Sequence, residues 1–280
     1  MNFWQAIILG AVQGFTEFLP VSSSGHLTLG AKFLGLPSPG LTFSIWVHMG
    51  TAFATLVMLR SEAAWLIKGL FAPESREDRR RSLAIFAYLA AASVPAGVIG
   101  LLFEDRIEMS FSSVTVASTG LIITGCILYL STRAAKVAAG SPGQCSPTGQ
   151  LPFETVTFSR SLVAGISQAI AIVPGISRSG MTISSGLVSG MSREDAARFS
   201  FLLSLPAVFG AGLLDVRSAL VAHVPVVTAH GLIGAGISFL TGILALSFVF
   251  ETVRKGELSK FSYYCWAVGI LSFVLSLLQG

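Results

Sequence analysis

Charged residues are scarce in this sequence. Only 11 % of its 280 residues are Asp, Glu, Lys or Arg, and 52 % are hydrophobic, whereas roughly a quarter of the residues of a typical soluble domain are charged. So few charges do not cover a water-facing surface. This composition excludes an ordinary soluble globule, a disordered chain and a nucleic-acid-binding protein that uses a basic patch. A polytopic membrane protein remains, because only helices and closed barrels satisfy their backbone hydrogen bonds in hydrocarbon.

Cysteine is also rare. The three cysteines, Cys126, Cys145 and Cys265, are odd in number and lack the spacing of a metal site, so neither a disulfide framework nor a zinc site is predicted. The apolar N-terminus has no basic flank and is interrupted by Glu17. We therefore expect it to be retained structure rather than a signal peptide.

The apolar runs are continuous rather than alternating, which favours helices over a β-barrel. Crossing the hydrocarbon takes ~20 residues of helix. Six runs meet or approach that length, at about 42–60, 83–103, 113–131, 197–217, 226–250 and 261–279. The sequence thus predicts an all-α protein with six transmembrane helices.

Two further apolar stretches, about 3–36 and 161–190, are each broken near the middle by proline, glycine and serine. The breaks are Pro20-Val21-Ser22-Ser23-Ser24-Gly25 and Pro174-Gly175-Ile176-Ser177-Arg178-Ser179-Gly180. Each half is too short to cross a bilayer and too apolar for a surface loop. This pattern predicts two re-entrant helical hairpins with polar tips.

The whole chain, 1–280, is expected to form one integral membrane domain. Its first half would cover 1–131, its second half 161–280, and a flexible cytoplasmic linker 132–160. Loops rich in Lys and Arg, at 60–82, 132–160 and 251–260, alternate with poor ones, and the rich loops belong in the cytoplasm. The run Arg76–Arg81 is interpreted as a solvated cytoplasmic face. The N-terminal hairpin then lies on the outer side.

The two hairpins resemble each other. The matching pairs are Gly10-Ala11-Val12-Gln13 with Gly165-Ile166-Ser167-Gln168, Pro20 with Pro174, Ser24-Gly25 with Ser179-Gly180, and, downstream, Phe43-Ser44 with Phe199-Ser200. Three spans separate the hairpins, so the second copy is inverted. Each tip would present a serine-capped helix N-terminus to one buried space, and such a space favours an anion.

Glu17 is the only charged side chain between Met1 and Lys32, and Arg178 is the only one between Arg160 and Arg193. A charge at membrane depth costs ~3 kcal/mol or more, so each is a functional candidate. Arg178 stands between Ser177 and Ser179, with Thr182 one turn on, a set of donors suited to phosphate. The alternative is that Arg178 and Glu17 form a buried ion pair that fixes the hairpins, and the two interpretations are compatible.

Gln13 and Glu17 are one helical turn apart and share a face. Together they are candidate ligands of a divalent cation, whereas Glu17 alone is a candidate general base. Ser23 and His26 are three residues apart, so they are a candidate nucleophile and its base. In the alternative, the imidazole of His26 acts directly on phosphorus or on its water, and Ser23 is only a helix cap. His48 is interpreted as a hydrogen-bonded packing residue.

The segments Gln13–His26 and Pro174–Thr182 resemble the two signature motifs of the undecaprenyl-diphosphate phosphatase family, the bacitracin-resistance proteins. The resemblance covers nearly the whole chain. It implies a multi-pass enzyme of the bacterial inner membrane that removes the terminal phosphate of undecaprenyl diphosphate and recycles this lipid carrier for cell-wall synthesis. With the N-terminal hairpin outside, the site would face the periplasm. Oligomeric state is not predicted, and no nucleic-acid partner is expected.

The resemblance also assigns roles to residues. The acidic motif falls on Gln13 and Glu17, and the serine–histidine motif on Ser23 and His26. The phosphate-binding motif falls on Ser177, Arg178, Ser179, Gly180 and Thr182. Dependence on Mg²⁺ or Ca²⁺ is implied by the family, which often has Glu at the position of Gln13, so this chain offers a single carboxylate there.

Two alternatives stay open. The type-2 phosphatidic-acid-phosphatase-like enzymes also use Ser-Gly-His and Ser-Arg pairs, but this chain lacks their Lys-x6-Arg-Pro element and has Ser184 where their second histidine is expected. A transporter or flippase of an anionic polyprenyl phosphate lipid would also use inverted repeats and broken helices. A carrier needs Arg178 but gains nothing from a base and a nucleophile.

Overall fold

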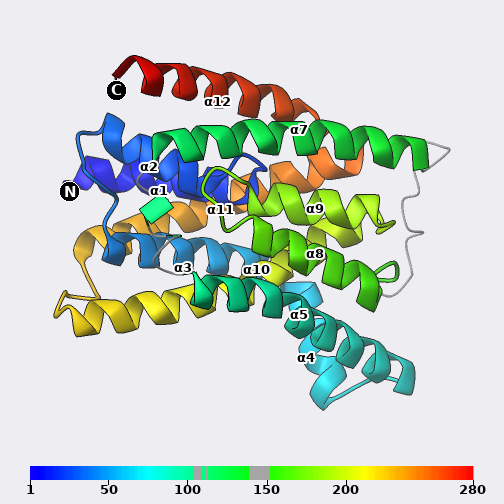
Figure 1. Cartoon of the computed structure of the whole chain (residues 1–280). Helices are drawn as coiled ribbons and strands as arrows, with labels where there is room; N and C mark the ends of the chain where they lie inside the picture. Colours follow the sequence, from blue (N-terminus) through cyan, green and yellow to red (C-terminus); the bar gives the residue numbers. More distant parts are fainter. Residues whose placement is uncertain (104–106, 108, 111–112, 139–151, 280) are drawn as a thin grey trace.

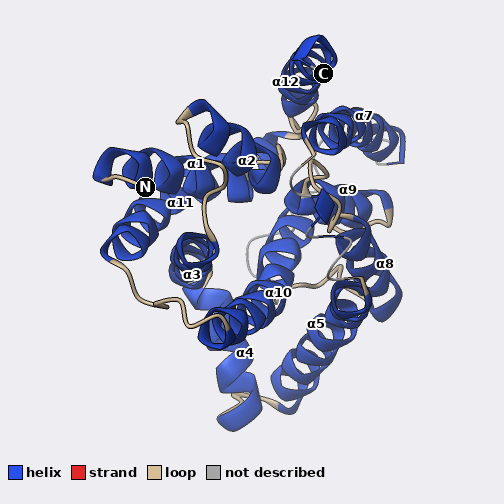
Figure 2. Cartoon of the chain, turned by 60° about the vertical axis from the view of Figure 1, so that its left-hand side comes forward, coloured by secondary structure: helices blue, strands red, loops and turns tan. Residues whose placement is uncertain are grey.

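The computed structural model describes residues 1–103, 107, 109–110, 113–138 and 152–279. Within these ranges the chain forms eleven helices and no strand (Figures 1 and 2). In chain order the helices are α1 (Phe3–Phe18), α2 (Ser23–Phe33), α3 (Leu41–Met58), α4 (Arg60–Phe71), α5 (Arg76–Leu102), α7 (Val114–Ala138), α8 (Phe158–Ile170), α9 (Arg178–Val188), α10 (Arg193–Val221), α11 (Ala229–Lys255) and α12 (Lys260–Gln279).

Six of the described helices are long and apolar enough to cross a membrane: α3, α5, α7, α10, α11 and α12. They coincide with the six predicted runs, so the all-helical class and the six candidate spans are confirmed. Four of them extend several residues beyond their predicted bounds. Helix α5 begins at Arg76 rather than near residue 83, and α10 covers Arg193–Val221 rather than 197–217. Helix α7 continues to Ala138 rather than ending near residue 131, and α11 continues to Lys255 rather than ending near residue 250.

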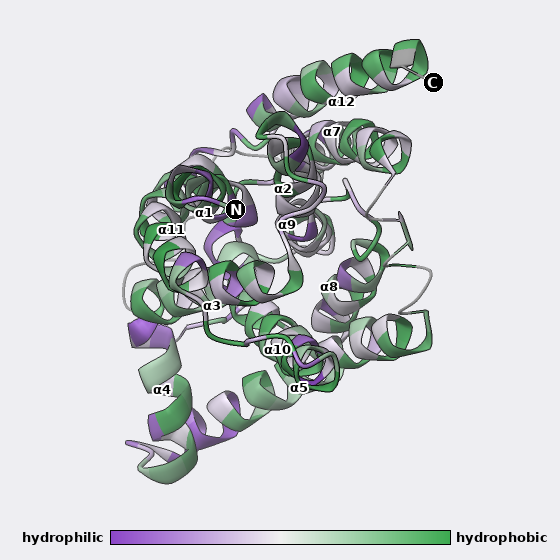
Figure 3. Cartoon of the chain, turned by 90° about the vertical axis from the view of Figure 1, so that its left-hand side faces the viewer, coloured by the Kyte–Doolittle hydropathy of each residue, from purple (hydrophilic) through white to green (hydrophobic). Residues whose placement is uncertain are grey.

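The segment 60–82, expected to be a loop, is largely helical. It contains α4 and the first turns of α5, whose N-terminus is capped by Ser75. Hydrophilic residues gather around this end of the molecule (Figure 3). The interpretation of Arg76–Arg81 as a solvated face is wrong for Arg81, because its guanidinium donates to the carbonyl oxygens of Phe153 and Val156.

The expected linker 132–160 overlaps helices at both ends, since α7 continues to Ala138 and α8 begins at Phe158. Residues 139–151, which include Cys145, lie outside the described residues.

Small polar side chains fix where several helices begin. Asn2 accepts from the backbone N–H of Gln5, whose own side chain accepts from the N–H of Asn2, and together they close a capping box at α1. Helices α8, α10 and α11 each have a simple N-cap, in which the side chain of Thr157, Ser192 or Thr228 accepts from one backbone N–H of the first turn. Each cap satisfies N–H groups that the first helical turn leaves without a partner.

Glycine allows the helices around the two breaks to pack closely. Helix α1 packs on α11, and a Cβ added at Gly10 would stand 2.8 Å from the carbonyl oxygen of Gly234. Helix α8 packs on α5, where a Cβ at Gly165 would overlap the backbone of Ala92. Helix α12 lies along α7, and α3 contacts both α10 and α11 (Figure 1). The short helices α1 and α8 are thereby held against long ones.

The chain breaks twice at the places that the proline and glycine residues indicate. Helix α1 ends at Phe18, two residues before Pro20, and α2 begins at Ser23. Helix α8 ends at Ile170, and α9 begins at Arg178, after Gly175 with φ +87°. Proline removes a backbone donor, and glycine accepts a left-handed φ, so neither helix continues through its break.

Candidate active site

The two breaks meet in a buried ion pair. Glu17, in the last turn of α1, accepts a hydrogen bond on Oε1 from Nη2 of Arg178, the first residue of α9. Their side chains are only 5 % and 20 % exposed. The predicted meeting of Glu17 and Arg178 is therefore confirmed, and so is the ion pair that the sequence left as an alternative role for them.

Further contacts join the two breaks. The hydroxyl of Ser179 donates to the carbonyl oxygen of Leu19 over 3.2 Å. A Cβ at Gly180 would stand 3.3 Å from Cβ of Pro20, so a larger residue would press on the first break. The segments 17–26 and 174–182, which are far apart in sequence, thus build one local structure.

Helix α7 holds the second break in place. Thr124 donates from Oγ1 to the carbonyl oxygen of Gly175 and accepts from the N–H of Ser177, both over 3.0 Å. A Cβ at Gly175 would overlap the carbonyl oxygen of Ala117. Glycine is required at position 175 for two reasons: its φ is positive, and the α7 backbone lies directly against it.

The hydroxyls that follow the second break are largely engaged with the protein itself. Ser177 caps α9 by accepting from the N–H of Gly180 over 3.1 Å, and its Oγ lies 3.2 Å from that of Ser179. Thr182 donates to the carbonyl oxygen of Arg178 over 2.8 Å and shares a hydrogen bond with Ser200 on α10. The predicted serine cap is confirmed for α9, while the contact of Ser200 was not predicted.

The first break is built differently. Ser22, the residue before α2, has φ +66° and makes no side-chain cap, so the predicted serine cap of α2 is wrong. Its hydroxyl lies 3.2 Å from that of Ser24 instead. A left-handed backbone at a residue other than glycine costs about 1–3 kcal/mol and is concentrated at functional sites.

The carboxylate of Glu17 is the centre of the hydrogen bonds at this site. Its Oε2 accepts from Oγ of Ser23 over 2.6 Å and from Nε2 of Gln13 over 2.9 Å. Ser23 is also the first residue of α2, so Glu17 stands at a helix N-terminus, which favours negative charge. Gln13 turns its amide nitrogen toward Glu17, and its Oε1 is buried with no hydrogen-bond partner among the described residues.

His26 is not paired with Ser23. Its Nδ1 lies 2.9 Å from the carbonyl oxygen of Ser22, and its Nε2 lies 2.8 Å from the hydroxyl of Tyr264 on α12. The serine–imidazole pair expected as one alternative is therefore absent from this arrangement. The hydroxyl of Ser23 is bonded to the carboxylate of Glu17 instead.

A second imidazole stands near Glu17. His48, on α3, places Nδ1 2.8 Å from the carbonyl oxygen of Ser44, as expected of a hydrogen-bonded packing residue. It also lies close enough to Glu17 for the two groups to interact electrostatically. This interaction was not predicted, since a lone histidine in an apolar span is most simply a packing residue.

Arg178 keeps one donor group open. Its Nη2 is bonded to Glu17, but its Nη1 is buried and has no hydrogen-bond partner among the described residues. A buried donor left without a partner costs about 1–3 kcal/mol. An anion with oxygen acceptors would satisfy it, and phosphate matches the planar guanidinium group well.

The residues at the site offer few metal ligands. No cluster of three or more His, Cys, Asp or Glu that suits a metal ion occurs in the described part of the chain. Both oxygens of Glu17 accept hydrogen bonds, and Oε1 of Gln13 is a buried oxygen that has no hydrogen-bond partner among the described residues.

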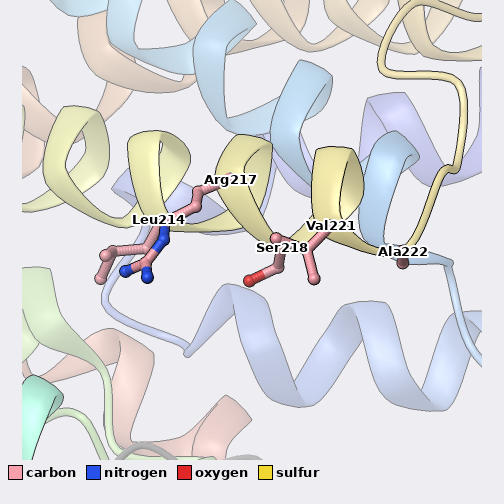
Figure 4. A pocket seen from close by; sticks show the side chains of 5 residues that line it. All are labelled: Leu214, Arg217, Ser218, Val221 and Ala222. Carbon is pink, nitrogen blue, oxygen red and sulfur yellow. The ribbon is translucent and has the colours of Figure 1, made fainter.

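A hollow of about 380 Å³ lies elsewhere, along the C-terminal half of α10 (Figure 4). Its lining residues are Leu214, Arg217, Ser218, Val221 and Ala222. None of them belongs to either break, so this hollow is distinct from the site around Glu17 and Arg178.

The model of the family described as bacitracin resistance protein BacA matches residues 6–271. The chain belongs to this family. Similar proteins named undecaprenyl-diphosphatase occur in Carboxydothermus hydrogenoformans (41 % identity, 98 % of each chain covered), Syntrophotalea carbinolica (41 %, covering 99 % of this chain and 100 % of the relative) and Desulforapulum autotrophicum (37 %, 98 % of each). The family membership agrees with the resemblance of the two motifs.

Proposed function

We propose that this protein hydrolyses undecaprenyl diphosphate to undecaprenyl phosphate and inorganic phosphate, and so recycles the lipid carrier of cell-wall synthesis and confers resistance to bacitracin. The names of its relatives support the substrate. The observation that carries the proposal is the unsatisfied Nη1 of Arg178, buried at the N-terminus of α9 and beside a carboxylate that is bonded to a hydroxyl. A carrier has no use for the carboxylate and the hydroxyl.

We assign binding of the terminal phosphoryl group of the substrate to Arg178. Its open Nη1 donates to a phosphoryl oxygen. Ser177, Ser179, Thr182 and the N–H of Gly180 bond within the protein in this arrangement, and they complete the anion site by exchanging those bonds for phosphoryl oxygens. Phosphoryl transfer passes through a loose transition state, so catalysis depends mainly on positioning and on electrostatic stabilisation. The N-terminus of α9 adds a partial positive charge at the same point.

Glu17 and Ser23 are the groups to which we assign proton removal. The 2.6 Å hydrogen bond aims the hydroxyl proton of Ser23 at Oε2 of Glu17, which is the geometry of a base and a nucleophile, or of a base and the water that takes the place of the hydroxyl. Phosphate competes with Glu17 for Arg178. When the guanidinium turns toward the substrate, Glu17 loses its strongest partner and becomes a better proton acceptor.

His26 is the group to which we assign a further proton transfer. It lies one turn after Ser23 on α2, at the same break, and its imidazole is oriented by two hydrogen bonds. The contacts favour Ser23 as the nucleophile and Glu17 as its base. Trapping a phosphorylated enzyme would distinguish attack by Ser23 or His26 from attack by water.

A divalent cation, Mg²⁺ or Ca²⁺, is proposed as a further component. Oε1 of Gln13 is the atom through which this chain would hold it, because that oxygen is buried and without a partner among the described residues. The cation would supply positive charge to the diphosphate, whose oxygens and water would provide most of its ligands.

We also infer that α1–α2 and α8–α9 are re-entrant hairpins in an inverted repeat. Helix α1 has 16 residues, about 24 Å at 1.5 Å per residue, which is less than the ~30 Å hydrocarbon core. The other three are shorter. The packing of α1 on α11 corresponds to that of α8 on α5, and matched glycines, Gly10 and Gly165, stand at the closest approach in each pair.

The proposed location is the bacterial inner membrane, with the site open to the periplasm. Support comes from the alternation of loops rich and poor in Lys and Arg and from the positive-inside rule.

Phosphate release from undecaprenyl diphosphate by the detergent-purified protein tests the activity. We expect multiple turnovers, with one phosphate released per lipid. In a second experiment, the protein is reconstituted into vesicles that hold the same lipid in one leaflet, and both phosphate release and movement of the lipid to the other leaflet are measured. Movement of the lipid between leaflets without any phosphate release, in vesicles and in detergent, would overturn the proposal in favour of a flippase.

A further inference from the structure

The last helix reaches the first break through Tyr264. The hydroxyl of Tyr264 lies 2.8 Å from Nε2 of His26, and the two rings stack with centroids 5.7 Å apart and planes inclined by 13°. His26 is separated from Tyr264 by 238 positions in the sequence, and no motif predicts the contact.

The bonds of His26 define which ring nitrogen carries the proton. The carbonyl oxygen of Ser22 only accepts, so Nδ1 of His26 must donate to it. Nε2 of the neutral ring then holds a lone pair, and the hydroxyl of Tyr264 donates to it. When the ring is protonated, the same hydroxyl accepts from Nε2–H. Tyr264 is therefore a partner of the imidazole in both of its protonation states.

A neighbouring residue fixes the place of Tyr264. Cys265 is fully buried, and its thiol lies 3.5 Å from the carbonyl oxygen of Pro20 in the first break. It packs with Val21 and Leu128, while α12 as a whole lies along α7. Because Cys265 is anchored, the residue before it is held beside α2 at a constant position. Tyr264 itself is 46 % exposed.

We propose that Tyr264 is a positioning residue for the reaction, which holds the imidazole of His26 in one plane and one tautomer. This inference rests on the proposed function, in which His26 transfers a proton. Tyr264 acts through His26 and does not bind the phosphoryl group, so it should affect turnover rather than affinity.

Tyr264→Phe tests this, because it keeps the ring and its stacking and removes only the hydroxyl. We expect kcat for undecaprenyl diphosphate to fall roughly tenfold, the rate equivalent of one lost hydrogen bond, with KM unchanged. Tyr263→Phe is the matched control, since Tyr263 is the adjacent tyrosine of α12, is 63 % exposed and has its ring against Trp266. It should leave both constants unchanged. In a His26→Ala background, Tyr264→Phe should have no further effect.

A second readout does not depend on activity. In protein labelled with ¹⁵N-histidine, the ring-nitrogen signals of His26, assigned by their loss in His26→Ala, should shift in Tyr264→Phe and not in Tyr263→Phe. If His26→Ala turns over normally while these signals shift, the role of His26 in the proposed function fails and the contact stands. Unchanged kcat and signals in Tyr264→Phe, a change in KM alone, or equal effects of both phenylalanine variants would overturn the inference.

Discussion

The carboxylate of Glu17 receives hydrogen bonds from Arg178, Ser23 and Gln13. A buried ion pair gains little stability over apolar packing, because both charges lose their hydration. This one also leaves Nη1 of Arg178 and Oε1 of Gln13 without partners among the described residues. A purely structural pair would be expected to satisfy its buried polar atoms. The arrangement is better explained as a site that awaits a polar ligand.

Ser23→Ala separates the function of the hydroxyl from that of the helix. Ser23 makes its side-chain bond to Glu17 and does not cap α2, so we expect kcat to fall by ~10²–10⁴ with little change in thermal stability. Ser24→Ala is the control, because among the described residues the Ser24 hydroxyl bonds to that of Ser22, and the bond from Thr28 goes to the backbone carbonyl oxygen of Ser24, which alanine keeps. Turnover of Ser23→Ala close to that of the wild type would remove this residue from the chemistry.

Gln13→Glu tests the proposed cation. A second carboxylate beside Glu17 strengthens the binding of a hard divalent ion, so the Mg²⁺ concentration that gives half-maximal activity should fall by roughly an order of magnitude. The measurement is a titration of activity with Mg²⁺ after treatment with a chelator. An identical titration curve for the two proteins would show that Gln13 does not contact the cation.

Sequence reasoning found some residues of the site and missed others for a physical reason. Glu17 and Arg178 stand out because a charge in an apolar stretch is costly. Thr124, Ser200 and Tyr264 are ordinary polar residues of long apolar helices, and their roles depend on which helix packs against which. Only Ser200 carried a signal, as part of the Phe43-Ser44 and Phe199-Ser200 match between the halves.

The breaks between α1 and α2 and between α8 and α9 have similar sequences but different local structures. Pro20 and Pro174 end the helices in both, as the sequence predicts. A serine was expected to cap the helix that follows in each case, yet only Ser177 does so. Ser22 instead adopts a left-handed φ and offers its carbonyl oxygen to His26. Backbone dihedral angles at a break depend on tertiary contacts, which local sequence does not specify.

Gly175→Ala tests whether α7 positions the second break. Both Gly175 and Gly35 have a positive φ, of +87° and +74°, but a Cβ at position 175 would overlap the carbonyl oxygen of Ala117, whereas Gly35 has open space around it. We expect Gly175→Ala to lower the melting temperature and the activity clearly, and Gly35→Ala to show only the cost of backbone strain, ~1 kcal/mol. Equal effects on a thermal melt would contradict the role assigned to this contact.

On the scale of the whole molecule, the sequence predicted the six spans well because the thickness of the bilayer sets their length and composition. It predicted α4 poorly, since the charges of 60–82 indicate a cytoplasmic loop and equally suit an amphipathic surface helix. The meeting of the two breaks was predicted from the sequence matches between segments about 155 positions apart. Packing such as that of α12 on α7 required the structure.

The proposed orientation predicts which side of the membrane reaches Ser24. In a background with Cys126, Cys145 and Cys265 replaced by alanine, a Ser24→Cys protein should react with a membrane-impermeant thiol reagent added to the periplasmic side. Glu77→Cys, at the start of α5, is the control and should react only from the cytoplasmic side. The reverse pattern of labelling would contradict the orientation.

A double-mutant cycle on the ion pair is the most direct examination of whether one pocket carries out the hydrolysis. Phosphate release from undecaprenyl diphosphate would be measured for the wild type, Glu17→Gln, Arg178→Gln and the double variant. Each single replacement should lower kcat by at least ~10², and the double variant should be little worse than the poorer single one, because the two residues act as a unit. Fully multiplicative losses, or near-normal turnover in either single variant, would contradict a shared catalytic centre.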